Sequence, residues 1–301
     1  MSGLDVSVVR AIVRKDLRQY LANPTGYVFL TLFIAATAAA AFLTEGFFAR
    51  NLADLAELNK LMPVVLMFFV PALTMGAWSD ERKNGTDEIL LTSPVRDIEV
   101  VLGKYLGVLG MYTVSLAFSV AHVLVLAYLG DPDPGLMFST YLGYWLMGAL
   151  LCSIGLLASM FTSNPTVAFI LGLVGCSGLV LAGAEPWAAG MLGTVVLGLL
   201  FALAWYVVRG GDLAGTSFAG GLGAVVGLAL WLPSLAPRLV PGLHEEIQPT
   251  KFIDAFQTFA VDQHFASFGE GIVRLGDLVY FAGGTAVLLY LCSFLLGRRH
   301  W

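Results

Sequence analysis

The sequence predicts an all-α polytopic membrane protein, a helical bundle of about eight spans. Of its 301 residues, 58% are hydrophobic and only 12% are charged, and the mean hydropathy is +0.82. A soluble domain carries about 25% charged residues. The apolar runs are also long, because a helix needs about 20 residues to cross roughly 30 Å of hydrocarbon. Helices are expected because lipid leaves open backbone groups unsatisfied.

The predicted spans share one property, which is that none of them contains Asp, Glu, Lys or Arg. They are Thr25–Thr44, Leu61–Trp78, Tyr105–Leu129, Leu136–Phe161, Pro165–Ala184, Trp187–Val208, Leu213–Leu232 and Leu278–Gly297. Pro63 and Pro71 predict a kink in the second span. Glycines recur within several spans, where they allow helices to approach one another closely.

Lysine and arginine predict the orientation, because cytoplasmic loops of membrane proteins are enriched in both residues. With the N-terminus inside and an even number of spans, most of the 16 Lys and Arg residues fall on the cytoplasmic side. Both termini and the charged segment Ser79–Lys104 are then cytoplasmic. The loop 45–60 and the polar segment 233–277 are then external.

An amphipathic helix is predicted before the first span, over Leu4–Leu21. Apolar residues recur along it at helical spacing, and Arg14, Lys15 and Arg18 lie on the other side. Such a helix lies in the membrane interface with its basic side toward anionic headgroups. It ends at Asn23-Pro24, because the residue before proline avoids the α region. Two roles remain open: a membrane anchor, or a lever that also touches a cytoplasmic partner.

In the external segment, Phe252, Phe256 and Phe259 follow one another at i, i+4 and i+7. This spacing predicts short amphipathic helices that dip into the outer interface just before the last span. One interpretation is a lid packed on the bundle. The other is a lateral gate or a docking site for an external partner.

Motifs for catalysis, metal binding and nucleotide binding are missing from the sequence. Gly103-Lys104 ends like a phosphate-binding loop, but the preceding glycine is missing and Tyr105 stands where Ser or Thr is needed. His122 lies alone inside a span, where a packed neutral histidine is expected. We therefore expect no enzyme activity, no metal and no cofactor in this chain. The net charge of −5 argues against nucleic acid as a partner.

The cysteines fall inside predicted spans, and we expect small buried apolar residues and no disulfide framework. They are Cys152, Cys176 and Cys292.

The segment Ser79–Lys104 is a charged island between two long apolar spans. Ser79 or Asp80 is predicted to cap a short helix, Gly85 to break it, and Thr86 to cap a second helix. A partner of this protein would contact it most readily here, because this is the longest charged segment on the predicted cytoplasmic side.

The apolar run Ile89–Leu91 is unusual for a solvated loop, and Ser93-Pro94 is predicted to end its helix. From the residues alone, two interpretations remain. The segment is either a helix that lies on lipid or a short helix that docks into a groove of a cytoplasmic partner.

The pattern Glu81-Arg-Lys-x-Gly-Thr-x-Glu-x-Leu-Leu-x-x-Ser-Pro94, followed by Gly103-Lys104, resembles the ABC-2 type permease family, and most closely its gliding-motility-type branch. Further segments carry the same resemblance. They are Arg14–Arg18, Asn23–Tyr27, Pro71–Met75, Leu129–Pro132, His264–Ile272 and Asp277–Phe281.

The resemblance implies the membrane subunit of an ABC exporter in a bacterial cytoplasmic (inner) membrane. A second permease subunit, as a homo- or heterodimer, and cytoplasmic ATPase subunits that bind ATP and Mg²⁺ would be its partners. An envelope or periplasmic partner is a further expectation. The implied ATPase-coupling residues are Glu81, Arg82, Gly85, Thr86, Glu88, Leu90, Leu91, Ser93 and Pro94.

The family usually has six spans, so about eight spans imply a six-span core with two additional helices. The segments are 1–24 as an interfacial connecting helix and 25–184 as spans one to five, with the coupling helix at 79–99. They continue as 185–238 with the additional spans, 239–277 with the external helices, and 278–301 with the last span and a basic tail.

One alternative function belongs to another class. The chain would then be a mechanotransmitting membrane subunit that acts on an envelope or motility partner and moves no substrate itself. The external segment 233–277 would be its output surface.

Overall fold

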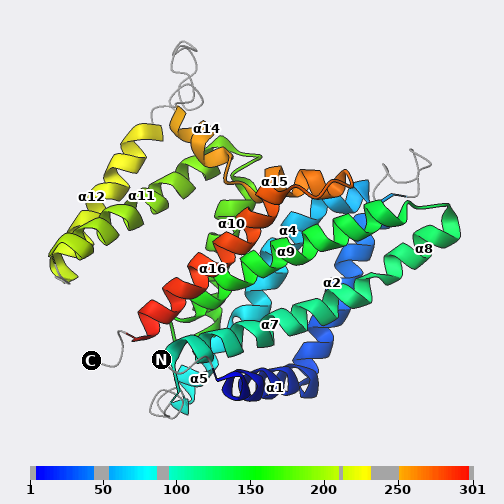
Figure 1. Ribbon diagram of the computed structural model, residues 1–301, viewed down its shortest axis with the longest axis horizontal. Coiled ribbons are helices and arrows are strands. Elements are labelled where there is room, and N and C mark those ends of the chain that lie inside the picture. The colour runs from blue at the N-terminus through cyan, green and yellow to red at the C-terminus, as the bar shows by residue number, and fades with distance from the viewer. Residues whose placement is uncertain (1–4, 44–53, 87–94, 210–212, 232–250, 298–301) are drawn as a thin grey trace. The chain divides into compact units, whose positions relative to one another are not determined.

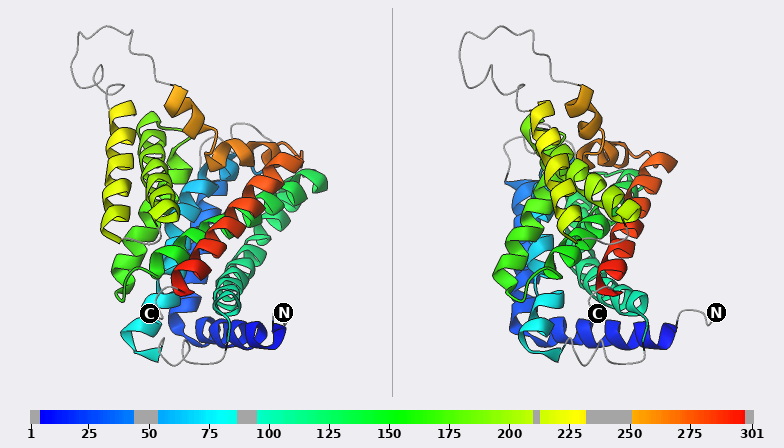
Figure 2. Two further views of the ribbon diagram at one scale, coloured as in Figure 1. Left: turned by 60° about the vertical axis from the view of Figure 1, so that its left-hand side comes forward. Right: turned by 90° about the vertical axis from the view of Figure 1, so that its left-hand side faces the viewer.

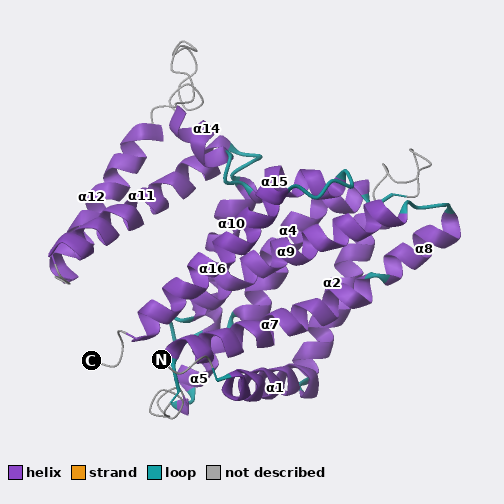
Figure 3. Ribbon diagram, viewed as in Figure 1, coloured by secondary structure: helices purple, strands orange, loops and turns teal. Residues whose placement is uncertain are grey.

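The computed structural model describes residues 5–43, 54–86, 95–209, 213–231 and 251–297, and within these ranges every regular element is a helix (Figure 3). The prediction of a helical membrane protein is therefore confirmed at the level of fold class. The helices are α1 (Val6–Ala22), α2 (Pro24–Phe42), α4 (Ala56–Thr74), α5 (Gly76–Lys83), α7 (Asp97–Ser119), α8 (Ala121–Leu129), α9 (Pro134–Ser159), α10 (Pro165–Leu181), α11 (Pro186–Arg209), α12 (Leu213–Trp231), α14 (Lys251–Gln257), α15 (Val261–Gly269) and α16 (Leu275–Gly297).

The chain divides into two compact units, one made of residues 1–176 and 264–301 and the other of residues 177–263. In the first unit, α9 packs against α4, α7 and α16, and α2 packs against α4 (Figure 1). Its core is apolar and aromatic, with Leu66, Met111, Tyr144 and Leu151 fully buried. Helix α1 lies across one end of this bundle, against α7 (Figure 2).

Among the described residues, four helical stretches are long and apolar enough to cross a membrane. They are Ala56–Lys83, Asp97–Leu129, Pro134–Ser159 and Leu275–Gly297, and α1 with α2 adds a fifth if that bent pair is one span. Shorter apolar helices coincide with the spans predicted over 165–184, 187–208 and 213–232. A span count of eight and the cytoplasmic location of both termini stay predictions.

The boundary between α1 and α2 follows from the local sequence. Asp5 caps α1, because its carboxylate accepts a hydrogen bond of 2.9 Å from the Ser7 amide. Asn23 is extended, and Pro24 opens α2. The two helices meet at 76°. The helix predicted over residues 4–21 is therefore found almost unchanged.

The span predicted over 105–129 lies within the apolar helical stretch Asp97–Leu129, whose hydrogen-bond ladder is interrupted at Val120 between α7 and α8. The carbonyl oxygen of Ser119 accepts a 2.8 Å hydrogen bond from the Tyr141 hydroxyl, and the His122 ring also contacts it. Side chains that take up a backbone carbonyl in this way interrupt the regular helical ladder. His122 is buried and stacks on Phe42, as expected of a packed histidine.

The second unit contains α11, α12 and α14. Helices α11 and α12 lie side by side, and Gly223 and Gly227 allow α12 to approach α11 closely. Helix α14 packs against α11, where Ile253 joins Ala182, Ala189 and Ala260 in a buried apolar cluster.

Candidate functional site

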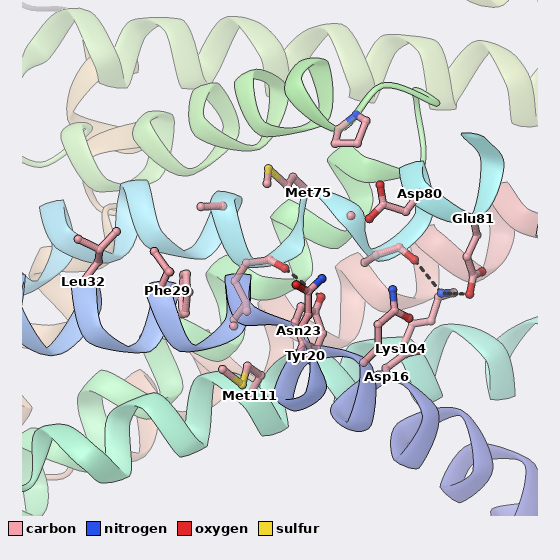
Figure 4. A pocket seen from close by; sticks show the side chains of 18 residues that line it. Asp16, Tyr20, Asn23, Phe29, Leu32, Met75, Asp80, Glu81, Lys104 and Met111 are labelled. Atoms are coloured by element: carbon pink, nitrogen blue, oxygen red, sulfur yellow. Dashed lines mark hydrogen bonds and ion pairs between the residues drawn. The ribbon is translucent and has the colours of Figure 1, made fainter. Parts of the chain in front are cut away.

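A buried lysine marks the point where α1, α5 and α7 meet. The Lys104 ammonium on α7 donates 2.7 Å to the carbonyl oxygen of Ala77 and lies 2.9 Å from Glu81 Oε1 on α5 (Figure 4). It also lies 4.9 Å from the centre of the Trp78 ring. Only 2% of the Lys104 side chain is exposed. A buried charge of this kind is stable only while it is paired and hydrogen-bonded.

The same Glu81 oxygen also binds a lysine of α1. Lys15 Nζ lies 2.8 Å from Glu81 Oε1, and 57% of the Lys15 side chain is exposed. Partial burial opposes the charge on Lys15, but the hydrogen bond and the negative charge of Glu81 outweigh it and raise the pKa of the ammonium. Glu81 therefore joins α5 to both α1 and α7.

Helix α1 packs on a row of glycines along one face of α7. A Cβ atom placed on Gly103 would lie 2.8 Å from Ile12, one on Gly107 would lie 2.9 Å from Asp16 Cβ, and one on Gly110 would lie 3.0 Å from Leu17. Small residues at this spacing let two helices approach closely. The apolar stripe of α1 therefore faces α7 at these positions, and the interpretation of α1 as an interfacial helix stays a prediction.

One residue of that packing face is acidic. Asp16 is 8% exposed, and it forms no hydrogen bond or ion pair with another described residue. Burial raises the pKa of its carboxyl above the ordinary value of 3.8, while the charges of Lys104 and Lys15 act in the opposite direction. An acid buried in this way is a candidate for contact with a ligand.

Two more hydrogen bonds hold α1 in place. The Asp5 amide donates 2.8 Å to the carboxylate of Glu99, which also accepts 3.2 Å from the Arg96 amide at the start of α7. The Tyr20 hydroxyl donates 3.0 Å to the carbonyl oxygen of Leu73 on α4. Helix α1 is thus fixed to α4, α5 and α7.

The structure describes part of the predicted coupling segment. Glu81 and Arg82 lie in α5, Gly85 follows with φ of 68°, and the Thr86 hydroxyl donates 3.3 Å to the carbonyl oxygen of Glu81. Gly85 therefore ends α5 as predicted, because a left-handed φ favours glycine. The other predicted residues lie outside the described ranges. They are Glu88, Leu90, Leu91, Ser93 and Pro94.

The predicted start of this helix is wrong. Ser79 and Asp80 are interior residues of α5, which begins at Gly76, so neither residue caps it. Met75 between α4 and α5 keeps helical dihedrals, and its amide donates to the carbonyl oxygen of Pro71, so α5 continues the course of α4. The charged residues that begin near Ser79 therefore mark a change from apolar to charged composition inside a helix and not the start of one.

The basic residues predicted for α1 are exposed. Arg14, Lys15 and Arg18 all lie in α1 at exposed positions, and the exposed Lys15 forms the ion pair with Glu81. Their contact with lipid headgroups stays a prediction.

The predicted gate phenylalanines lie in and just after α14. Phe252 and Phe256 belong to α14, but α14 ends at Gln257, so Phe259 lies beyond it and is 54% exposed. Phe256 packs against the apolar cluster of the second unit. Phe259 follows in the turn after α14, where its amide donates 3.2 Å to the carbonyl oxygen of Phe256 and its ring centre lies 6.1 Å from that of Phe256. The role of these residues as an external gate stays a prediction.

Sequence reasoning missed a polar corner between α15 and α16 in the first unit. The Asp277 carboxylate accepts 2.6 Å from the Ser267 hydroxyl and lies 2.8 Å from His264 Nδ1. The His264 ring stacks on Tyr280, with 3.9 Å between ring centres. These residues belong to two of the segments that carried the family resemblance, His264–Ile272 and Asp277–Phe281.

Lys104 and Asp16 were also missed as site residues. A four-residue spacing is common to Ile12 and Asp16 on α1 and to Gly103 and Gly107 on α7. This matched spacing is the signal that could have paired the two helices before the structure was known. The cysteines are buried and unpaired, as expected. They are Cys152, Cys176 and Cys292.

Comparison with known families adds one match. Residues 49–185 match the family described as ABC-2 family transporter protein. The match supports the ABC-2 type transporter permease family and indicates a membrane component of an ABC transporter, which generally pairs with an ATPase subunit. It covers Glu81, Lys104 and the whole segment between them. No curated protein matches the chain.

Proposed function

We propose that the chain is the transmembrane permease subunit of an ABC-2 type exporter, and that a separate cytoplasmic ATPase drives it through the segment 79–99. ATP and Mg²⁺ would bind to that ATPase. The observation that carries the proposal is the Lys15–Glu81–Lys104 cluster, because it joins the base of the segment to α1 and α7.

The connections suit the transmission of movement. The segment leaves the bundle through α5 and returns through α7, and Glu81 and Lys104 hold these two ends together. A displacement of the segment would therefore move α7. Helix α7 is bonded in turn to α9, because the Tyr112 hydroxyl donates 2.7 Å to the carbonyl oxygen of Tyr144 and the Tyr105 hydroxyl 3.2 Å to that of Ala149.

Coupling also needs a difference in binding between two states of the partner. The ATPase can shift the permease only by the difference in its affinity for the two arrangements of these helices. The exposed residues Lys83–Thr86 offer a contact surface, and space around Gly85 is open, since a Cβ atom there would meet nothing within 4 Å.

The membrane location of the chain is proposed from its exposed basic residues. Arg14, Lys15 and Arg18 are exposed along α1, and basic residues favour the cytoplasmic side. We place the chain in a bacterial cytoplasmic membrane, where a second permease subunit completes the transport path.

Co-purification tests the proposal. The chain is expressed with the ABC ATPase encoded beside its gene, and the ATPase retained on the tagged permease is measured. Leu90→Asp combined with Leu91→Asp is expected to abolish retention while membrane insertion stays normal. Full retention by this variant would contradict the coupling role.

The control replaces an exposed leucine that lies outside the predicted spans. Leu275 at the start of α16 is 76% exposed, so Leu275→Asp makes the same chemical change without touching α5. This control is expected to retain the ATPase.

A further inference from the structure

A cavity of about 550 Å³ opens between α1, α2, α4, α5 and α7. Figure 4 shows that its two ends differ in character: Phe29 and Leu32 lie at one end, and Asp16, Asp80, Glu81 and Lys104 at the other. This volume falls in the range of sites that bind small molecules.

The charged end has an excess of acid. Lys104 is already paired with Glu81, whereas Asp16 and Asp80 form no ion pair with another described residue. Glu81 Oε2 is buried and has no hydrogen-bond partner among the described residues. Buried acceptors of this kind are normally satisfied. The end therefore fits a cationic group that donates several hydrogen bonds.

The geometry points away from a metal ion and toward an organic cation. Within the described ranges, no three His, Cys, Asp or Glu side chains converge closely enough to hold a metal ion. Asp16 and Asp80 come from different helices, α1 and α5. An ammonium group has three N–H donors, which can serve separate acceptors.

The opposite end of the cavity is apolar. Val28, Phe29 and Leu32 contribute from α2, Leu73 from α4 and Met111 from α7. Val28 and Leu32 are 59% and 55% exposed, although α2 carries no charged residue. An apolar lining that continues onto the surface of an apolar helix suits a hydrocarbon chain.

We propose that this cavity binds an amphiphile with a primary ammonium headgroup, such as phosphatidylethanolamine. The ammonium binds at the charged end of the cavity, which Asp16, Asp80 and Glu81 line, and the hydrocarbon chain lies along Phe29 and Leu32. Because Asp16 belongs to α1 and Asp80 to α5, the bound amphiphile bridges these two helices. This site does not depend on the proposed coupling to an ATPase.

Native mass spectrometry of the detergent-purified chain tests the site. Dioleoyl phosphatidylethanolamine is compared with the phosphatidylglycerol and phosphatidylcholine of the same acyl chains. Preferential binding of the ethanolamine lipid is expected, since the other two headgroups lack N–H donors on a cation. Equal retention of all three lipids would overturn the proposal.

Substitutions of the acidic residues that line the cavity test whether the lipid binds there. Asp16→Asn is expected to weaken ethanolamine-lipid binding about tenfold or more, because a charge-assisted hydrogen bond is lost. Asp131→Asn is the matched control, since Asp131 is exposed between α8 and α9, and it is expected to bind like the unchanged chain. Asp80→Asn repeats the test on α5 if Asp16→Asn folds poorly. Unchanged binding in both cavity variants would overturn the proposal.

Competition identifies the part of the lipid that is recognised. Dodecylamine carries the ammonium and the chain without a phosphate, and it is expected to displace the ethanolamine lipid. Failure to compete at concentrations that leave the chain folded would contradict recognition through the ammonium.

Discussion

The Lys104 ammonium lies 2.9 Å from Glu81 Oε1, although Lys104 belongs to α7 and Glu81 to α5. The two helices are the ends of the charged segment that the sequence marks as the contact surface. Because both side chains are largely buried, the pair fixes the distance between these ends. Removing Glu81 leaves the buried Lys104 without a counter-charge, whereas removing Lys104 leaves Glu81 paired with Lys15 alone.

Lys104→Met is therefore expected to destabilise the chain by about 1–3 kcal/mol, since Glu81 loses its main counter-charge and keeps only the ion pair with the exposed Lys15. Thermal unfolding of the detergent-solubilised chain measures this. Lys60→Met is the control, because the Lys60–Glu57 pair has a 57% exposed lysine and such pairs are worth about 0–1 kcal/mol. Equal losses in the two variants would show that the buried pair has no special role.

The double variant Glu81→Gln with Lys104→Met is expected to be more stable than Lys104→Met alone. It removes the carboxylate that has lost its main counter-charge together with that partner. A double variant whose loss equals the sum of the two single losses would contradict direct coupling between these residues.

Gly107→Ala is expected to destabilise the packing of α1 on α7 by about 1–3 kcal/mol, because its Cβ atom would meet Asp16 at 2.9 Å. Limited proteolysis after α1 measures whether the helix detaches. Gly276→Ala on α16 is the matched change, since a Cβ atom there meets nothing within 4 Å. If both variants resist proteolysis equally, the close contact is not needed.

The pH dependence of stability should reveal Asp16. Its pKa is raised in the folded chain, mainly by burial, so its contribution to stability is present below the ordinary value of 3.8 and is lost as the pH rises through the raised value. Asp16→Asn removes the titrating carboxyl, so the variant does not lose this part of its stability as the pH rises. The unfolding temperature of the variant relative to the unchanged chain should therefore increase over that interval, and a constant difference would contradict the burial of a titrating carboxyl.

Asp277→Asn is expected to loosen the corner between α15 and α16. The substitution weakens the bonds from Ser267 and His264 and lowers stability by about 1–3 kcal/mol. Thermal unfolding measures the effect, with the exposed Glu270→Gln as control. A variant as stable as this control would show that the corner is not structural.

Much of the fold could be predicted from the sequence, because long apolar runs and strong stop signals determine it. Asn23-Pro24 placed the boundary between α1 and α2, and the left-handed turn at Gly85 was expected from its residue type. The break at Val120 was not visible, since it depends on Tyr141 from another helix. The end of α14 at Gln257 was likewise not visible, although the Phe259 ring beyond it still lies against that of Phe256.

The site was harder to predict, because its residues act through partners distant in the chain. Glu81 was selected as a contact for another protein, and the structure pairs it with Lys15 and Lys104. Asp16 belonged to neither face of the predicted amphipathic helix, and only its position over Gly107 explains its burial. Which two helices pack together depends on the three-dimensional structure. A single sequence indicates it only through the matched four-residue spacing of residues on the two helices.

Photo-crosslinking from the segment 79–99 tests the central claim most directly. Thr86→Cys places a thiol at an exposed position, and the native Cys152, Cys176 and Cys292 are buried, so a benzophenone maleimide labels residue 86 selectively. On illumination of the complex, a covalent adduct with the ABC ATPase is predicted for Thr86→Cys and none for Asp131→Cys. An intact complex that gives no adduct at residue 86, or equal adducts at both positions, would contradict the account.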